Sequence, residues 1–199
     1  MNVHSASTVD TGKRAAILRA ALQVFAAHGV HGTAVPEIAA AAQVGVGTVY
    51  RYFTNKEQLV NELFRDTKRR LKARLGNGLD LTLPPKALFD AFWSRLVAFA
   101  REEPQAFQFL ELQDHLAYLD QESRDVELDL LAPIWLVCLE FRKKGLLDPA
   151  VRPEVAMALI WGAFVGAFKA ERNGYFTLAP ADLAFVRDTC WRGITISHE

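Results

Sequence analysis

The chain has 199 residues, 51% of them hydrophobic, and its 23 Lys and Arg equal its 23 Asp and Glu in number. This length allows one domain or two and a sizeable core, and the zero net charge excludes an argument for any partner from bulk charge. The charge is unevenly distributed, however. Residues 1–75 carry eleven Lys and Arg against five Asp and Glu, and residues 76–199 carry twelve against eighteen. Unless this is ordinary scatter of surface charge, only the first part is expected to meet a polyanion.

The order of helical patterns along the chain predicts an all-α protein. Ala, Leu and Phe are abundant, and few β-branched residues alternate with polar ones. Caps at Thr11 and at either Asn55 or Thr54, and ends at Gly29, Gly145 and Asn173-Gly174, delimit several of the helices. The expected helices cover residues 11–28, 33–42, 46–53, 55–75, 86–101, 104–118, 123–144, 153–172 and 180–192. A three-helix head is thus joined by a connecting helix to a larger helical body, with a boundary at residues 76–85.

Targeting and redox features predict a soluble cytoplasmic protein. The first residues contain no apolar core typical of a secretory signal. The longest uncharged apolar stretch, residues 155–168, is 14 residues long, shorter than the roughly 20 that span a bilayer. Cys138 and Cys190 lie in apolar helical stretches and are expected to be buried free thiols. No Cys/His cluster suggests a metal, and we expect no cofactor.

The segment from Thr33 to Val60 predicts two short helices joined by a tight turn, followed by the start of a third. This is the outline of a helix-turn-helix that binds the major groove of DNA. In its second helix Val46, Val49 and Phe53 are spaced three and four residues apart and are expected to pack inward. The other side offers donors for base edges and phosphates. Its residues are Thr48, Arg51 and Tyr52, with Gly47 and Tyr50 along the edge.

The segment GTVYRYFTNKEQL, residues 47–59, resembles the tetracycline-repressor (TetR) family of bacterial transcription regulators. The resemblance extends over roughly residues 11–60, and it is most specific at Gly47, Tyr50, Phe53, Lys56 and Glu57. It implies DNA contacts at Thr33, Gly47, Thr48, Tyr50, Arg51, Tyr52 and Lys56. It also implies three parts: a mobile N-terminal arm (1–10), a helix-turn-helix DNA-binding domain (11–56) and a helical ligand-binding and dimerisation domain (57–199).

The chain departs from the family pattern in the turn before the second helix. The family often has Gly where this chain has Gln43, and Ser and Lys where this chain has Gly45 and Val46. Gly45 lacks a side chain that could cap the helix, and Val46 lacks a cation that could bind phosphate. An ordinary packing helix is the alternative interpretation of the tyrosine-rich segment. The basic run of residues 67–74 is interpreted as a solvated helix face.

The aromatic residues of the body predict a small-molecule pocket, because such sites combine apolar walls with a few polar groups. The resemblance implies an inducer there. Most of the aromatics are expected to be core, and for His115 a structural role is favoured over a ligand contact. The candidate pocket residues are Phe89, Phe92, Trp93, Phe107, Glu111, Asp114, His115, Tyr118, Trp135, Trp161, Phe164 and Phe168.

The last two helices predict a pairing surface. Gly162 and Gly166 lie one turn apart and let a neighbouring helix approach closely, within one chain or between two. In the family that this chain resembles, the final two helices form a two-fold interface, which suits palindromic operators. The candidate interface residues are Leu159, Gly162, Gly166, Leu183, Val186, Cys190 and Ile194.

These features predict a ligand-responsive repressor that binds a palindromic DNA operator as a homodimer and is released by a small, mostly apolar or aromatic inducer. One alternative is a DNA-binding regulator without an inducer. Another is a helical enzyme or carrier that retains the head. No nucleophile or carboxylate pair stands at a spacing typical of catalysis, so we do not expect an enzyme.

Overall fold

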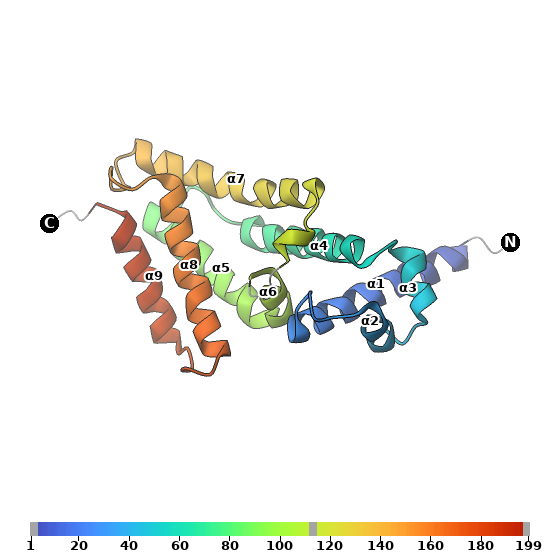
Figure 1. Ribbon diagram of the computed structural model, residues 1–199. Helices are drawn as coiled ribbons and strands as arrows, with labels where there is room; N and C mark the ends of the chain where they lie inside the picture. The colour runs from blue at the N-terminus through green and yellow to red at the C-terminus, as the bar shows by residue number, and fades with distance from the viewer. Residues whose placement is uncertain (1–3, 112–114, 197–199) are drawn as a thin grey trace. The chain divides into compact units, whose positions relative to one another are not determined.

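The computed structural model describes residues 4–111 and 115–196, with side chains described from residue 12 onward. Within these ranges the chain is helical and contains no strand, which confirms the all-α fold (Figure 1). The elements are α1 (His4–His28), α2 (Val35–Ala41), α3 (Val46–Tyr52), α4 (Lys56–Gly76), α5 (Pro85–Glu102), α6 (Pro104–Glu111), the 3-10 turn η1 (Leu116–Tyr118), α7 (Gln121–Lys143), α8 (Pro153–Arg172) and α9 (Pro180–Ile194).

Local sequence signals account for several helix ends. Gly29, Gly145 and Gly174 have φ values of 79°, 68° and 77°, the left-handed conformation in which glycine ends a helix without strain. At the start of α4, Asn55 Oδ1 accepts a hydrogen bond of 2.8 Å from the Gln58 N–H, so of the two predicted caps it is Asn55 that caps the helix.

Two predicted boundaries are wrong. α1 begins at His4 and not at Thr11, because residues 4–10 contain no glycine or proline to stop the helix from extending backward. The helix predicted for residues 104–118 ends at Glu111 and is followed by η1. Apolar periodicity marks which residues pack inward, but it does not show where a chain leaves one helix and enters a turn.

The chain divides into two compact units, which we call the head unit (residues 1–71 and 100–127) and the body unit (residues 72–99 and 128–199). Residues 100–127 thus pack with the N-terminal helices, although the sequence assigned them to the body. The functional boundaries at residues 10 and 56 stay predictions.

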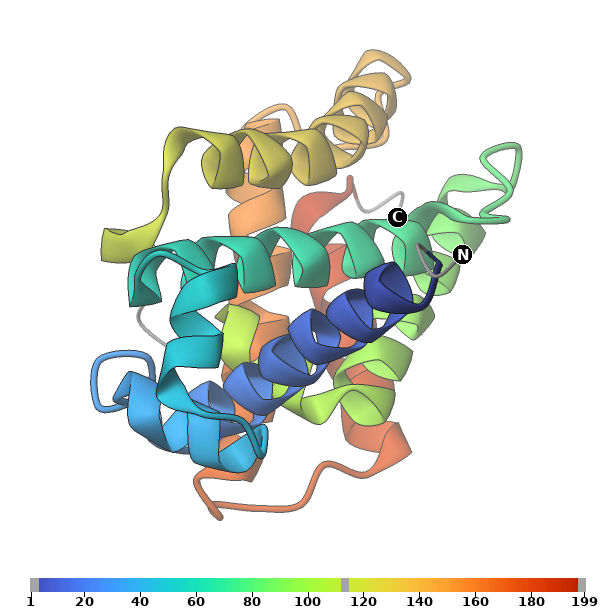
Figure 2. The ribbon, with the colours of Figure 1, turned by 90° about the vertical axis from the view of Figure 1, so that its right-hand side faces the viewer.

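In the head unit, α1 packs against α2 and α6, and α2 packs against α3. Figure 2 shows α1, α2 and α3 gathered beside the first half of α4. The predicted apolar stripes form its core: Ile17, Ala21 and Phe25 of α1 and Leu59 of α4 are fully buried. The rings of Phe25 and Phe109 stack with centroids 6.0 Å apart, so α6 is part of this core.

In the body unit, α8 and α9 pack side by side (Figure 1). Leu147, Ala156 and Ile194 form a buried cluster, against which Cys138 and Phe141 pack. Among residues 4–111 and 115–196, α8 is the one helix long and apolar enough to cross a membrane by length and composition, which are criteria that a core helix also meets. Its contact with α9 already gives it a protein partner.

Candidate DNA interface and effector site

A left-handed turn sets the angle between α2 and α3. Gln43 has φ 56°, the one positive φ among the described non-glycine residues. The Val44 N–H donates to the Ala39 carbonyl at 3.0 Å, which closes the end of α2. The chain then enters α3 through Gly45, whose extended backbone and lack of a side-chain cap agree with the loss expected from the sequence.

Two apolar side chains anchor α3 in the head unit. Val49 and Phe53 are each 1% exposed. The third residue predicted to pack inward, Val46, is 37% exposed, and that prediction is wrong. Val46 lies in the first turn of α3, where the helix has not yet reached the core. The Arg14 guanidinium lies 5.4 Å from the centre of the Phe53 ring and pairs with Glu62, a brace that helical periodicity did not reveal.

The outer side of α3 presents the predicted groove-facing residues to solvent. Tyr50 is 49% exposed, and Gly47 and Arg51 are also exposed, whereas Thr48 and Tyr52 are half-buried. A Cβ atom added at Gly47 would meet nothing within 4 Å, so the backbone is open to a close approach. The Arg51 guanidinium donates to the Tyr52 hydroxyl at 3.1 Å, which orients both side chains.

Lys56 is the first residue of α4 and so lies at the N-terminal end of that helix. Its ammonium lies 5.7 Å from the centre of the Tyr118 ring. Partial burial lowers its pKa, and the Glu37 carboxylate opposes this effect. A phosphate bound here would meet both the cation and the positive end of the helix dipole.

Thr33 does not offer its hydroxyl to DNA. The residue is 3% exposed, and its Oγ1 donates to the Gly29 carbonyl at 2.7 Å. The hydroxyl satisfies the end of α1 instead of facing a phosphate, so we remove the Thr33 side chain from the candidate contacts. A threonine just before a helix is typical of both roles, and sequence could not distinguish them.

The predicted pocket residues are divided between the two units, and Asp114 lies outside the described residues. Phe107, Glu111, His115 and Tyr118 belong to the head unit. Phe89, Phe92, Trp93, Trp135, Trp161, Phe164 and Phe168 belong to the body unit. The residues of the single site expected from the sequence therefore form two groups, one in each unit.

In the head unit the four residues are engaged in different ways. Phe107 is 4% exposed, and His115 is 3% exposed with its ring 5.3 Å from that of Phe109. This favours the structural role for His115. Glu111 pairs with the buried Lys68 at 3.2 Å. Tyr118 contacts His31 and Lys56. Neither of these two residues belongs to the predicted pocket.

In the body unit a chain of ring contacts joins α5, α8 and α9. The Phe164 ring lies 5.3 Å from Trp93, 5.8 Å from Trp161 and 4.9 Å from Phe168. Phe89 contacts both Trp93 and Trp191. Trp191 is the member that the sequence analysis missed, since it lay among residues assigned to pairing. Phe92 is half-buried, and Trp135 is 38% exposed and donates to Glu154 at 3.2 Å.

Trp93 contributes a polar group, its indole N–H, to this aromatic cluster. The residue is 3% exposed, and its Nε1 has no hydrogen-bond acceptor among the residues that the structure describes. A buried donor without an acceptor costs roughly 1–3 kcal/mol. Such a donor could bind an acceptor atom of a molecule that enters the cluster. The ring of Phe164 meets Trp93 edge-on at 84°, a geometry that also stabilises an isolated aromatic pair.

Two surface hollows are lined by residues outside the predicted pocket. One, of about 250 Å³, lies in the head unit among charged side chains that include Arg14, Glu62 and Arg65. The other, of about 360 Å³, lies in the body unit beside Phe176, Leu178 and Phe185. The second hollow adjoins α8 and α9, the helices of the predicted pairing surface.

The predicted pairing residues fall into two groups. Leu159 is 47% exposed, Gly162 and Gly166 are exposed, and Val186 is half-buried. Leu183, Cys190 and Ile194 are 8%, 3% and 3% exposed. These three pack into their own unit, so their assignment to the interface is wrong. The apolar stripe of α9 faces α8 and the core of its own chain. It is therefore already covered and not available to a second chain.

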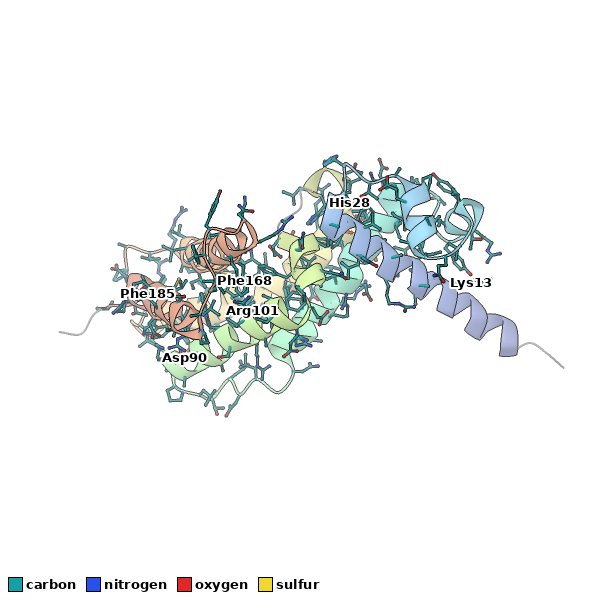
Figure 3. The ribbon with its side chains drawn as sticks, turned by 90° about the horizontal axis from the view of Figure 1, so that it is seen from below. Lys13, His28, Asp90, Arg101, Phe168 and Phe185 are labelled. Atoms are coloured by element: carbon teal, nitrogen blue, oxygen red, sulfur yellow. The ribbon has the colours of Figure 1, made fainter. Side chains whose placement is uncertain are left out.

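The exposed side of α8 and α9 contains apolar residues that the sequence analysis did not select. Val155 is 43% exposed and lies one turn before Leu159, and Phe185 of α9 is 67% exposed. Figure 3 marks Phe185 and the buried Phe168 of α8. A Cβ atom added at Gly162 or Gly166 would meet nothing within 4 Å. This open face of small and apolar residues is suited to close packing of another helix.

The titratable groups of the body unit are held mainly by ion pairs. Hydrogen bonds from Arg187 and Lys86 hold the pKa of Asp188 far below its usual range. Burial raises the pKa of the Cys138 and Cys190 thiols, which makes them poor nucleophiles at neutral pH. Among the described residues there is no group of His, Cys, Asp and Glu that could hold a metal ion.

Comparisons with known proteins agree over nearly the whole chain. Residues 17–63 match a family profile described as bacterial regulatory proteins of the tetR family, and residues 64–196 match one described as a tetracyclin repressor-like C-terminal domain. The transcriptional repressor KstR2 of Mycolicibacterium smegmatis is 27% identical over 184 residues, which cover 90% of this chain and 76% of that protein.

Solved structures show the same fold. A TetR-family transcription regulator from Marinobacter aquaeolei superimposes with a TM-score of 0.80 at 23% identity, covering 96% of this chain and 100% of that one. The regulator FadR of Bacillus subtilis, solved in complex with stearoyl-CoA, has a TM-score of 0.68 at 20% identity and covers 88% and 94%.

Proposed function

Since this chain belongs to the TetR family of bacterial transcriptional regulators, we propose that it is a repressor that binds a palindromic operator as a homodimer and leaves it when a small, mostly apolar or aromatic molecule binds in its body. The relatives named above are transcriptional regulators. A cytoplasmic location follows from this role, since the operator is chromosomal DNA.

The observation that carries the proposal is the two-sided arrangement of α3. Val49 and Phe53 bury one side in the head, and Gly47, Tyr50 and Arg51 are exposed on the other. A helix held in this way can enter the major groove without losing its support. We propose that Thr48, Tyr50, Arg51 and Tyr52 contact bases and phosphates, that the Gly47 backbone approaches the DNA closely, and that Lys56 binds a phosphate.

The homodimer is supported by the exposed face of α8 and α9. Val155, Leu159, Gly162 and Gly166 are open to solvent on α8, and Phe185 is open on α9. A two-fold pairing through this face would place two α3 helices on one operator, and half-sites would be separated by a whole number of helical turns.

The effector is proposed to bind at the aromatic cluster of the body unit, with Trp93 Nε1 as the donor to a carbonyl or carboxyl oxygen. The FadR regulator of B. subtilis was solved with stearoyl-CoA, and a long acyl chain fits the chemistry of this cluster. Binding of effector and operator must weaken each other by the same factor.

Selection from a random duplex library followed by affinity measurements tests the function. We expect a two-fold symmetric site to be enriched. The double variant Tyr50→Ala, Lys56→Ala should then lose specific binding. As a matched control, Tyr175→Ala with Lys169→Ala removes an exposed tyrosine and lysine from the body unit and should bind normally. If the double variant of the head retains full affinity for the selected site, the assignment of α3 is wrong.

The effector has its own test. Stearoyl-CoA should release the wild-type protein from the selected duplex and raise its melting temperature, and Trp93→Phe should reduce both effects. A protein that binds the duplex but shows neither effect with stearoyl-CoA, stearate or aromatic acids would be a regulator without such an inducer.

A further inference from the structure

Tyr118, at the end of η1, contacts two separate parts of the DNA-binding head. Its hydroxyl lies 3.2 Å from His31 Nδ1, and the two rings are 5.1 Å apart at an angle of 51°. The Lys56 ammonium also lies 5.7 Å from the centre of the Tyr118 ring. His31 belongs to the turn between α1 and α2, and Lys56 begins α4. One side chain therefore touches both ends of the helix-turn-helix.

The backbone of Tyr118 is fixed to α4 by a buried asparagine. Asn61, 4% exposed, donates from Nδ2 to the Tyr118 carbonyl at 2.7 Å. Its Oδ1 accepts from the Asp120 N–H at 2.9 Å and from the Ser123 hydroxyl at 2.7 Å. Because both the nitrogen and the oxygen of the Asn61 amide are hydrogen-bonded to this segment, residues 118–123 are held in a single register against α4.

A second contact secures the same segment. Arg65, one turn after Asn61, donates to the Asp120 carboxylate at 2.9 and 3.1 Å and to Ser123 Oγ at 3.2 Å. The Tyr118 ring is thus presented to Lys56 from a rigid base, and its position does not depend on a mobile loop tip. Held in this way, the ring can restrict where the Lys56 side chain lies.

The position of Lys56 makes such restriction useful. A cation at the first residue of a helix is disfavoured by the helix dipole, and an anion bound there is favoured. Glu37 is the carboxylate that acts on Lys56 from α2, and the Tyr118 ring contacts it from η1. A lysine held between these groups loses less side-chain entropy when a phosphate binds than a freely rotating lysine would.

We propose that Tyr118 is a positioning residue for DNA binding, which acts by holding the Lys56 ammonium and the His31 turn in the arrangement that receives a backbone phosphate. The proposal rests on the proposed function, because it assumes that Lys56 binds DNA. It moves Tyr118 from the predicted effector pocket to the DNA interface. The chemistry concerned is that of a phosphodiester, so the effect is independent of base sequence.

The probe for this proposal is a fluorescein-labelled 30-bp duplex of random sequence, titrated by anisotropy over a series of KCl concentrations. Tyr118→Leu should weaken binding about two- to fivefold, the range expected for loss of an exposed cation–π contact. The slope of log K against log [KCl] should also fall, by part of the roughly 0.9 that one phosphate contact contributes. Tyr118→Phe, which keeps the ring, should retain most of the slope.

A double-mutant cycle separates positioning from a general structural effect. In the Lys56→Ala background, Tyr118→Leu should cause no further loss of affinity or slope. If the losses add, or if Tyr118→Leu leaves the slope unchanged, Tyr118 does not act through Lys56 and the proposal is overturned. If Tyr118→Leu fails to fold by circular dichroism, Tyr118→Met, which is unbranched and adaptable, replaces it in the same cycle.

A matched control and the wild type complete the test. Tyr175→Leu removes a tyrosine that is 76% exposed in the body unit, and it should change neither affinity nor slope. Wild-type protein that binds no duplex at any salt concentration would overturn the proposed function together with this inference. Wild-type binding with a Tyr118→Leu variant that binds equally well would overturn the inference and leave the proposed function standing.

Discussion

The Arg65 guanidinium donates from one nitrogen, Nη1, to both carboxylate oxygens of Asp120, at 2.9 and 3.1 Å. Arg65 is 9% exposed, whereas the Asp120 side chain is 48% exposed. Burial alone would raise the pKa of Asp120, but hydrogen bonds from Ser123 and the charge of Arg65 lower it overall. The pair joins the middle of α4 to the start of α7 within the head unit.

Arg65→Leu should destabilise the protein by about 2 kcal/mol, less than the loss of a fully buried ion pair because Asp120 is half exposed. Urea unfolding followed by circular dichroism measures the change. Arg69→Leu is the matched control, one turn further along α4, since its side chain is 61% exposed and lies 3.8 Å from Glu122. Equal losses for the two variants would show that the burial of Arg65 contributes nothing.

Gln43→Gly should raise the free energy of unfolding by about 0.5 kcal/mol. Gln43 has φ 56°, and relief of about 1 kcal/mol of left-handed strain exceeds the entropy that glycine loses on folding. Gln43→Val, with a β-branched side chain at the same φ, should lower it by about 1–2 kcal/mol. Urea midpoints measure both variants, and midpoints that move in the same direction would contradict this account of the turn.

Gly162→Leu should abolish dimerisation without harming the fold of one chain. A side chain at Gly162 has no neighbour within 4 Å in its own chain, and leucine is favoured over glycine within a helix by about 0.8 kcal/mol. Sedimentation velocity should show a dimer for wild type and a monomer for the variant. Gly76→Leu, at another glycine with open space around it, should stay dimeric. A dimeric Gly162→Leu protein would rule out this face.

The lowered pKa of Asp188 predicts that the protein loses stability in acid. Arg187 and Lys86 lower its pKa in the folded state, so the folded protein releases this proton at a lower pH than the unfolded chain does. Its contribution is fully present above the unfolded value of about 3.9 and is lost as the pH falls toward the folded pKa. Figure 3 marks Asp90, which also pairs with Lys86 and Arg187.

Asp188→Asn should therefore lower stability at pH 7 by about 0.5–1 kcal/mol, a modest value because the side chain is 42% exposed. As the pH falls below about 4, the difference between the variant and the wild type should shrink progressively. Urea unfolding between pH 2.5 and 7 measures the effect. Asp129→Asn, which breaks one exposed pair with Lys72, should change the profile less. Parallel curves for wild type and Asp188→Asn would contradict the assigned shift.

Much of the fold could be predicted from the sequence because its signals are local. The range of α8 was predicted from a proline at its first residue and Asn173-Gly174 at its end, and the structure confirms it. The stripe of Ile17, Ala21 and Phe25 is buried as its spacing predicts. These outcomes depend on bonds within one helical turn and on which residues share a face, and both are written in consecutive residues.

The arrangement of the candidate site could be predicted only in part. The anchoring of α3 by Val49 and Phe53 followed from spacing, and so did the exposure of Tyr50. The basic run at residues 67–74 was interpreted as a solvated face, yet Lys68 is 5% exposed and pairs with Glu111 and Glu127. Its partners belong to α6 and α7. The pattern of residues within α4 does not show that these two helices pack against it.

The sequence by itself determined the helix-turn-helix, the family and most helix ends, because capping, periodicity and turn chemistry act between residues a few positions apart. Only the tertiary structure decided that the Thr33 hydroxyl turns inward, that Leu183, Cys190 and Ile194 face their own core, and that Tyr118 meets His31 and Lys56. Each of these depends on which distant segment covers a given face, and hydrophobic burial, being non-directional, does not specify that partner in advance.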